Sequence, residues 1–196
     1  MNAKLVPYNP AMARATLAGR KTQTRRPVSP QPSFLDEAPA WRYDGFDERG
    51  GCHYLEALDA NGEPTGHSRD IGKCCYGEVG DTLIAVRASK INKLLNCILA
   101  ALWPPPVFGV FARMPITNLR AERLQAISKA DAIAEGIERV LDHILDTPIY
   151  KDYTMRSNGL LSPIASFATL WDTLYATRGL GWDANPWIWV IEHPKL

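Results

Sequence analysis

Residues 19–27 read Gly-Arg-Lys-Thr-Gln-Thr-Arg-Arg-Pro and come directly after a helical pattern over residues 10–18. Asn9 is a suitable N-cap for that helix, and Pro10 suits its first turn because the missing N–H would have no partner there. Gly19 is a natural end of the helix, since glycine enters the left-handed conformation without a Cβ clash. The next seven residues hold four cationic side chains and two threonines. The sequence therefore predicts a short helix that leads into a cationic strand.

The direction of these side chains depends on where the strand begins. If residues 23–26 are extended, Thr24 and Arg26 point to one face, because side chains alternate along a strand. Lys21 joins them only if it lies on the turn that leaves the helix. An ammonium, a hydroxyl and a guanidinium would then form an anion-binding pocket. The alternative is a basic turn exposed to solvent.

Composition limits the classes of function. The chain has 196 residues, of which 46% are hydrophobic and 22% are charged, as is typical of one globular domain. Its formal net charge of +1 disfavours a broad positive surface that would bind duplex nucleic acid regardless of sequence. Any affinity for nucleic acid must come from a local cluster, and residues 20–26 contain such a cluster.

Patterns typical of metal sites and membrane segments are missing from the sequence. The four cysteines form no C-x-x-C pair and have no histidines at zinc-ligand spacing. The apolar run over residues 97–111 is interrupted by three prolines and is too short to cross a bilayer. No apolar signal core lies near the N-terminus. We therefore expect a cytoplasmic protein without metal or cofactor, with surface histidines at His53, His67, His143 and His193.

The hydrophobic pattern predicts an α+β fold of short elements. Strands are expected at residues 52–58, 65–71, 82–87, 110–119 and 187–191, and the first two should form a polar surface hairpin around Asn61-Gly62. Helices are expected at residues 89–102, after a Ser128 cap, and from Ser162-Pro163 to Gly179. A helix fragment plus loop is expected over residues 139–158. The helix after Ser128 should bury Ala130, Ile133, Ala134 and Ile137, with Glu135 beside them.

Four blocks of sequence resemble the phage and prophage type of ASCH domain, a branch of the PUA-like superfamily. The first is Gly-Arg-Lys-Thr-x-Thr-Arg-Arg at residues 19–26, directly after a short N-terminal helix. The others are Tyr-Gly-Glu-Val-Gly-Asp-Thr-Leu at 76–83, the two segments at 123–128 and 134–137, and Trp-Asp-Ala-Asn-Pro-Trp-Ile-Trp-Val at 182–190. They occur in the order found in the family and span most of the chain.

The resemblance implies a PUA-like mixed β-barrel flanked by short helices. It implies a single ASCH domain over residues 1–196, with an inserted β-hairpin at about residues 28–75. The chain departs from the family pattern at two points. Ala88 stands where relatives carry a Glu, and residues 103–109 differ from the Trp- and Arg-containing segment of relatives. Substrate contacts made by that segment are therefore not implied here.

One bacterial group within the ASCH family hydrolyses N4-acetylcytidine to cytidine and acetate with a Lys, a Thr and a Glu. By this resemblance the catalytic residues here are Lys21, Thr24 and Glu135, and Arg26 is a substrate-binding residue. No cofactor is implied. The implied partner is an acylated cytidine, with RNA as a further candidate. The alternative for Glu135 is a solvated helix carboxylate.

Amide cleavage needs a nucleophile, a proton acceptor and a donor to the oxyanion. Thr24 can attack only if a base takes its proton, and Lys21 can be that base if burial or Arg26 lowers its pKa. Glu135 would then orient Lys21 or protonate the leaving N4 amine, and Arg26 or a backbone N–H would face the oxyanion. In the alternative division Glu135 activates a water and Thr24 only donates a hydrogen bond.

Asn185 and Trp187 are further candidates for binding a base, by pairing and by stacking. Their alternatives are a turn-forming Asn and a core Trp. Two other functions also remain open. One is a non-catalytic reader of RNA or modified bases in which Lys21, Arg25 and Arg26 hold phosphate, and the other is a ribonuclease.

Overall fold

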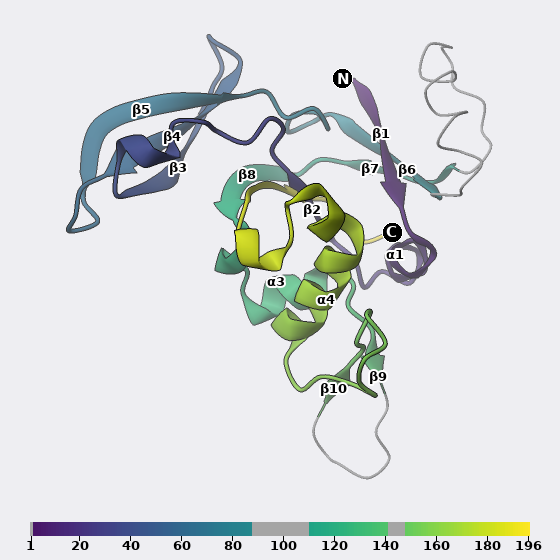
Figure 1. Cartoon of the computed structure of the whole chain (residues 1–196). Coiled ribbons are helices and arrows are strands. Elements are labelled where there is room, and N and C mark those ends of the chain that lie inside the picture. Colours follow the sequence, from purple (N-terminus) through teal and green to yellow (C-terminus); the bar gives the residue numbers. More distant parts are fainter. Residues whose placement is uncertain (1, 88–109, 141–147) are drawn as a thin grey trace.

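The computed structural model describes residues 2–87, 110–140 and 148–196 and shows a mixed α+β fold made mostly of short strands (Figure 1). This confirms the expected class. The strands are β1 (Ala3–Tyr8), β2 (Gln23–Pro27), β3 (Ala40–Asp47), β4 (Cys52–Leu58), β5 (Pro64–Gly72), β6 (Thr82–Arg87), β7 (Val110–Pro115), β8 (Asn118–Arg123), β9 (Arg139–Val140), β10 (Ile149–Tyr150) and β11 (Trp187–Glu192). The helices are α1 (Pro10–Leu17), α3 (Lys129–Ala134) and α4 (Pro163–Tyr175), with 3-10 turns η1 (Leu35–Glu37), η2 (Leu124–Ala126), η3 (Ala176–Arg178) and η4 (Trp182–Ala184).

The described strands form three three-stranded sheets and the short β9–β10 pair. Their orders are β1-β6-β7, β2-β11-β8 and β3-β4-β5, and only the β1–β6 pairing is parallel. Within the described ranges these sheets do not close into one barrel, so the expected closed barrel is not found. In Figure 1 the β3–β5 sheet extends to the left of the molecule, away from β1, β6 and β7.

The chain passes from the first sheet to the second directly after Pro115. A single strand was expected over residues 110–119, but the structure has β7 and β8 with a break between them. Proline has no N–H for a strand ladder, which favours an interruption at this point. Ile116 N donates to Asp81 O, and Thr117 N donates to Glu192 O, at 2.8 and 2.9 Å. The two residues after the proline therefore bond to different sheets.

Of the described helices, α1 and α4 both begin where the sequence predicts, and α1 also ends there. Helix α4 ends at Tyr175, and the 3-10 turn η3 leads from it to the predicted stop at Gly179. Asn9 Oδ1 accepts from Met12 N at 2.8 Å at the start of α1, and Gly19 follows the helix with φ +67°. Ser162 caps α4 in the same way, and Gly179 has φ +72° after η3. These ends depend on capping and on positive φ, which are properties of a few neighbouring residues.

The insertion differs from the expected surface hairpin. A third strand, β3, pairs with β4, so β4 lies between two partners. The β4 side chains His53, Leu55 and Ala57 are buried, and Leu55 belongs to the main hydrophobic cluster. The insertion is therefore a sheet packed on the core.

Two expectations for the later part of the chain are wrong. The buried residue of α3 is Ala132. Of the residues expected to be buried there, Ile137 is buried as predicted, whereas Ala130 is exposed and Ile133 is 47% exposed. Residues 139–140 and 149–150 form a two-stranded ribbon, and no helix is present in the described part of residues 139–158. The expected helix over residues 89–102 lies outside the described residues.

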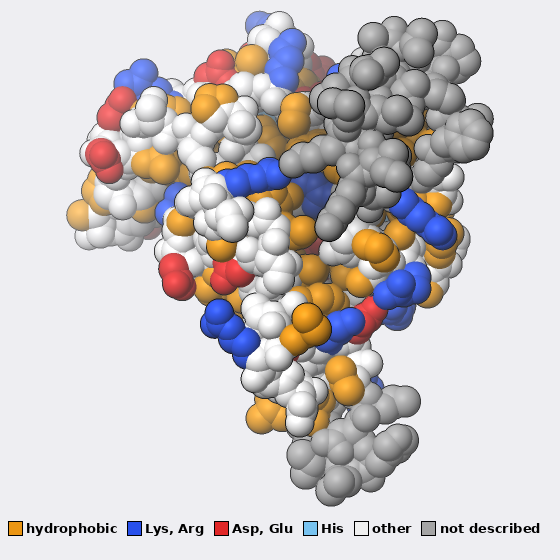
Figure 2. Space-filling model, turned by 45° about the vertical axis from the view of Figure 1, so that its right-hand side comes forward, with side chains coloured by type: hydrophobic (Ala, Val, Ile, Leu, Met, Phe, Trp, Pro, Cys, Tyr) orange, Lys and Arg blue, Asp and Glu red, His pale blue; other side chains and the backbone are white. Residues whose placement is uncertain are grey.

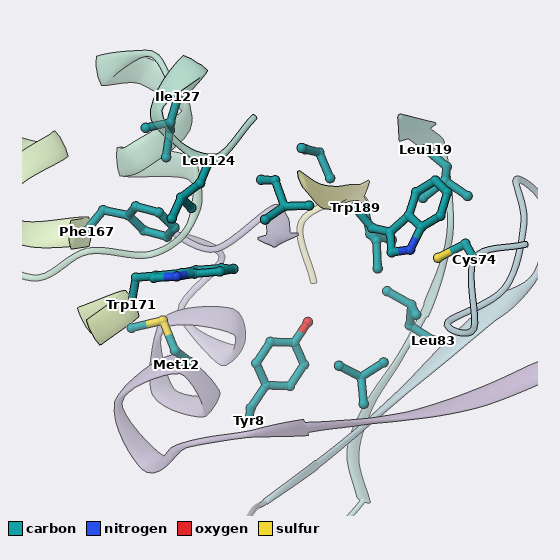
Figure 3. Close-up of a cluster of buried hydrophobic side chains, with 14 of the residues drawn as sticks. Tyr8, Met12, Cys74, Leu83, Leu119, Leu124, Ile127, Phe167, Trp171 and Trp189 are labelled. Carbon is teal, nitrogen blue, oxygen red and sulfur yellow. The ribbon is translucent and has the colours of Figure 1, made fainter. Parts of the chain in front are cut away.

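Aromatic side chains from several elements contribute to one hydrophobic core. Figure 3 shows Phe167 and Trp171 of α4 on one side and Trp189 of β11 on the other. Tyr8, the last residue of β1, lies between them with its hydroxyl directed toward the interior of the cluster (Figure 3). None of the described helices combines the length and the apolar character needed to cross a membrane.

Candidate active site

The turn between α1 and β2 lies against the C-terminal end of α3. Thr22 N donates to Ala134 O at 2.8 Å, and Lys21 Nζ donates to Glu135 O at 3.0 Å. These bonds satisfy carbonyls that a helix end leaves without partners, and a cation there also interacts favourably with the helix dipole. A stretch near residue 21 is thereby joined to one near residue 135.

Gly136 permits this close approach. Its φ is +88°, and a Cβ at this position would lie 2.8 Å from Ala15 Cβ and 2.9 Å from Lys21 Cβ. Real Cβ atoms do not approach so closely, so any other residue would push α3 away from the turn. Glycine at this position therefore allows Lys21 to reach Glu135.

Lys21 and Glu135 form a buried ion pair. Lys21 Nζ lies 2.7 Å from Glu135 Oε2, and the two residues are 2% and 4% exposed. The ammonium also donates to Gln23 O at 2.5 Å, so three acceptors surround its three N–H groups. The second carboxylate oxygen, Oε1, accepts from Arg25 at 3.2 Å. Both oxygens of Glu135 are thus engaged by cations.

Arg25 links this ion pair to a wider network of ion pairs and hydrogen bonds. Its guanidinium is 3.5 Å from both Glu122 and Asp131, and it donates to Gln23 Oε1 at 2.8 Å. Arg25 itself is 1% exposed. A buried guanidinium with three acidic neighbours is compensated inside the protein, which leaves it unsuited to hold an external phosphate.

Burial lowers the pKa of Lys21 from its ordinary value to about 8. The carboxylate of Glu135 opposes this effect, whereas the charges of Arg26 and Arg25 add to it. An ordinary lysine is almost fully protonated at neutral pH, but a pKa of about 8 allows a substantial neutral fraction near pH 8. Lys21 therefore meets the main requirement of a general base.

A cavity of about 890 Å³ opens onto this pair. Lys21, Thr24, Arg26 and Glu135 all line it, so the structure brings four of the predicted site residues to one place. The remaining wall is Pro7, Tyr8, Asn9, Met12, Arg25, Pro27, Ser29, Cys75, Tyr76, Phe167, Leu170, Trp171, Leu174, Tyr175, Arg178 and Leu180. Most of these side chains are apolar or aromatic, as in sites that bind small molecules.

Two neighbouring hydroxyls buried in the cavity wall make no hydrogen bond of ordinary geometry to the described residues, although one of them lies close enough to the other to affect its pKa. They are Thr24 Oγ1 and Tyr8 Oη. Burial raises the pKa of Tyr8 to about 12, against the effects of the Arg26 charge and the neighbouring Thr24 hydroxyl. Tyr8 therefore stays a hydrogen-bond donor over the working pH range. Unsatisfied buried hydroxyls cost stability, and their position indicates a function toward a ligand.

Sequence reasoning missed the aromatic part of this wall. The sequence pattern gave no function to Tyr8 or Tyr175, and Tyr76 was noted only as part of a sequence block. Burial raises the pKa of Tyr76 to about 12 as well. The position of Tyr8 directly before the Asn9 cap was the available signal, because that helix leads into the cationic stretch.

Asn185 and Trp187 do not line the cavity. Asn185 has φ +42°, and its Oδ1 accepts from Gln125 N at 2.8 Å, so it serves as a turn residue. Trp187 is 2% exposed, and Arg123 lies over its ring at 5.8 Å. The structure gives these two residues the alternative roles, a turn-forming Asn and a core Trp.

The expectation of surface histidines is wrong for two of the four. His53 is buried, with Tyr43 Oη 2.8 Å from Nδ1 and Glu78 Oε2 2.9 Å from Nε2. Its ring also lies 4.7 Å from that of Trp189, so it joins the insertion to the core. His193 is buried behind Thr22, whose carbonyl accepts from its backbone N–H. His143 lies outside the described residues.

Comparison with known protein families, with curated proteins and with solved structures found no match.

Proposed function

We propose that this chain is an ASCH-type amidohydrolase with a PUA-like fold that cleaves the N4-acyl amide of N4-acetylcytidine and related cytidines. The products would be cytidine and a carboxylic acid. The observation that carries the proposal is the buried Lys21–Glu135 pair, which shares a cavity with the unpartnered hydroxyl of Thr24. A nucleophile, a base of lowered pKa and a group that orients the base are what acyl transfer requires.

In the first step Thr24 Oγ1 attacks the acyl carbonyl carbon while its proton passes to the neutral amine of Lys21. Nζ must be neutral at that moment, since the ammonium form has no lone pair to accept a proton and its three N–H groups donate to three acceptors. Collapse of the tetrahedral intermediate breaks the bond from the carbonyl carbon to N4, and Lys21 returns the proton to the leaving amine. Water then hydrolyses the acyl-threonine by the same proton route and releases the acid.

The hydrogen bonds of Glu135 favour this division of roles over one in which Glu135 activates a water. Each of its carboxylate oxygens already accepts from a cation, Oε2 from Lys21 and Oε1 from Arg25. Neither oxygen can take a proton from a water without giving up its hydrogen bond from a cation. Glu135 is therefore proposed to orient Lys21.

The alternative of a phosphate-holding RNA module receives less support. Lys21 and Arg25 are both buried and paired with carboxylates, so two of the three cations assigned to phosphate face inward. On the face in Figure 2 the Lys and Arg side chains lie in separate groups among apolar and neutral surface. Neither feature is typical of a surface that follows a nucleic-acid backbone.

The test is turnover of N4-acetylcytidine by the purified protein, followed as cytidine release. We expect wild-type activity and a loss of about 100-fold or more in Lys21→Ala and in Thr24→Ala. Lys129→Ala, which removes an exposed lysine on α3, is the matched control and should retain activity. Full activity in the Lys21 and Thr24 variants would contradict the assigned roles. Salt-dependent RNA binding without turnover would favour the reader, and RNA cleavage that persists in Lys21→Ala would place a ribonuclease elsewhere.

A further inference from the structure

The charges that line the cavity do not balance. Four cations, Lys21, Arg25, Arg26 and Arg178, face one carboxylate, that of Glu135. Glu135 neutralises Lys21 and pairs with Arg25 as well. Arg25 is also close to the carboxylates of Glu122 and Asp131. The remaining two arginines have no carboxylate partner in the part of the chain that the structure describes. The cavity therefore carries positive charge that a ligand can neutralise.

Both arginines are held in place by aromatic rings. Arg26 lies over the Tyr8 ring at 5.6 Å, and two of its nitrogens donate to Arg25 O and Pro7 O, each at 2.9 Å. Arg178 lies over the Tyr175 ring at 5.7 Å. Guanidinium groups stacked on aromatic faces keep N–H groups available at their edges and lose little conformational freedom when they bind an anion.

Burial orders these residues along the cavity. Lys21 and Thr24 are fully buried, Arg26 is half-buried and Arg178 is exposed. The reacting amide belongs at the buried end, and the arginines lie toward solvent. A cytidine held with N4 at Thr24 directs its ribose away from the buried end. A phosphate on that ribose is the anionic group that the two arginines would meet.

We propose that Arg26 and Arg178 form a phosphate subsite, and that the preferred substrate of the cavity is an N4-acylated cytidine nucleotide. This inference rests on the proposed function. Phosphate oxygens match the fork of N–H groups that a guanidinium presents, and the dianion supplies the missing negative charge. The two arginines are enough for a single phosphate group, so the proposed ligand is a mononucleotide and not a nucleotide within an RNA strand.

The first test is equilibrium binding of cytidine 5′-monophosphate, cytidine 3′-monophosphate and cytidine, measured by calorimetry without any turnover. We expect at least one monophosphate to bind about tenfold or more tightly than cytidine, because charge-assisted hydrogen bonds have this magnitude. Its affinity should fall as salt is raised, and that of cytidine should not. Arg178→Gln should reduce the preference for the monophosphate about tenfold, whereas Arg49→Gln, on the exposed loop between β3 and β4, should leave it unchanged.

The second test compares hydrolysis of N4-acetylcytidine, its monophosphates and a short RNA that contains N4-acetylcytidine. A higher kcat/KM for a monophosphate, lost in Arg178→Gln, supports the subsite. Equal binding and equal hydrolysis of nucleoside and nucleotides would overturn it while the amidohydrolase stands. A preference for the RNA would also overturn the mononucleotide assignment. Tight binding of a monophosphate without turnover of any acylated substrate would support the phosphate subsite but contradict the proposed amidohydrolase function.

Discussion

The proposed reaction should depend on pH through Lys21. The amine must be neutral to accept a proton, and its pKa is about 8. The neutral fraction is then about one tenth at pH 7, one half at pH 8 and nine tenths at pH 9. The initial rate on N4-acetylcytidine at low substrate should therefore rise about tenfold between pH 7 and pH 9 and level off above that range.

A change at Glu135 gives this prediction a second test. Its carboxylate raises the pKa of Lys21, so Glu135→Gln removes a stabiliser of the ammonium and should move the inflection below pH 8. Glu138→Gln is the matched control, because Glu138 pairs with Lys151 at 2.9 Å instead. Initial rates measured at half-unit pH steps locate each inflection. A wild-type rate that falls between pH 7 and pH 9 would refute Lys21 as the base and favour Glu135 acting beside a protonated lysine.

Three further predictions concern stability and are checked by urea unfolding. Glu135→Ala leaves two buried cations without their shared partner and should cost about 3–5 kcal/mol, whereas Glu138→Ala at a partly exposed pair should cost at most about 1 kcal/mol. Gly136→Ala should cost about 1–3 kcal/mol more than Gly179→Ala, because both have positive φ but only Gly136 has neighbours that a Cβ would strike. Equal losses of stability in Gly136→Ala and Gly179→Ala would show that α3 can shift to accommodate the added Cβ. Thr24→Val should abolish turnover without loss of stability, since the hydroxyl that it removes is buried and has no partner among the described residues. A large loss of stability would indicate that the hydroxyl is structural.

The local features of this protein follow from short stretches of its sequence. Asn9 caps α1, Gly19 follows it with positive φ, and Ser128 and Ser162 cap the later helices. Capping, backbone restriction and strand alternation act over a few residues, so their causes are contained in the sequence that shows them. The alternation of side chains along a strand likewise predicted that Thr24 and Arg26 lie on one face of β2, and both line the cavity.

Long-range features were predicted only in part. A polar hairpin was expected at residues 52–71, but His53 and Leu55 are buried, because β3 pairs with β4 and the sheet packs against the core. The α3 pattern pointed to Ile133 as a buried residue, yet Ala132 and Glu135 are the ones that face inward. A six-residue helix has too few turns for periodicity to select one face.

The chemistry of the site depends on contacts between parts of the chain that are far apart in sequence. Lys21 and Glu135 are 114 residues apart in sequence, and the glycine after α3 sets their contact. The lowered pKa of Lys21 comes first from removal of water by the surrounding fold, which no local pattern specifies. The cavity wall likewise comes from β1, β2 and α4, and the placement of Asn185 and Trp187 outside it follows from how those elements pack. Desolvation and cavity shape are properties of packed elements, so they appear only once the chain has folded.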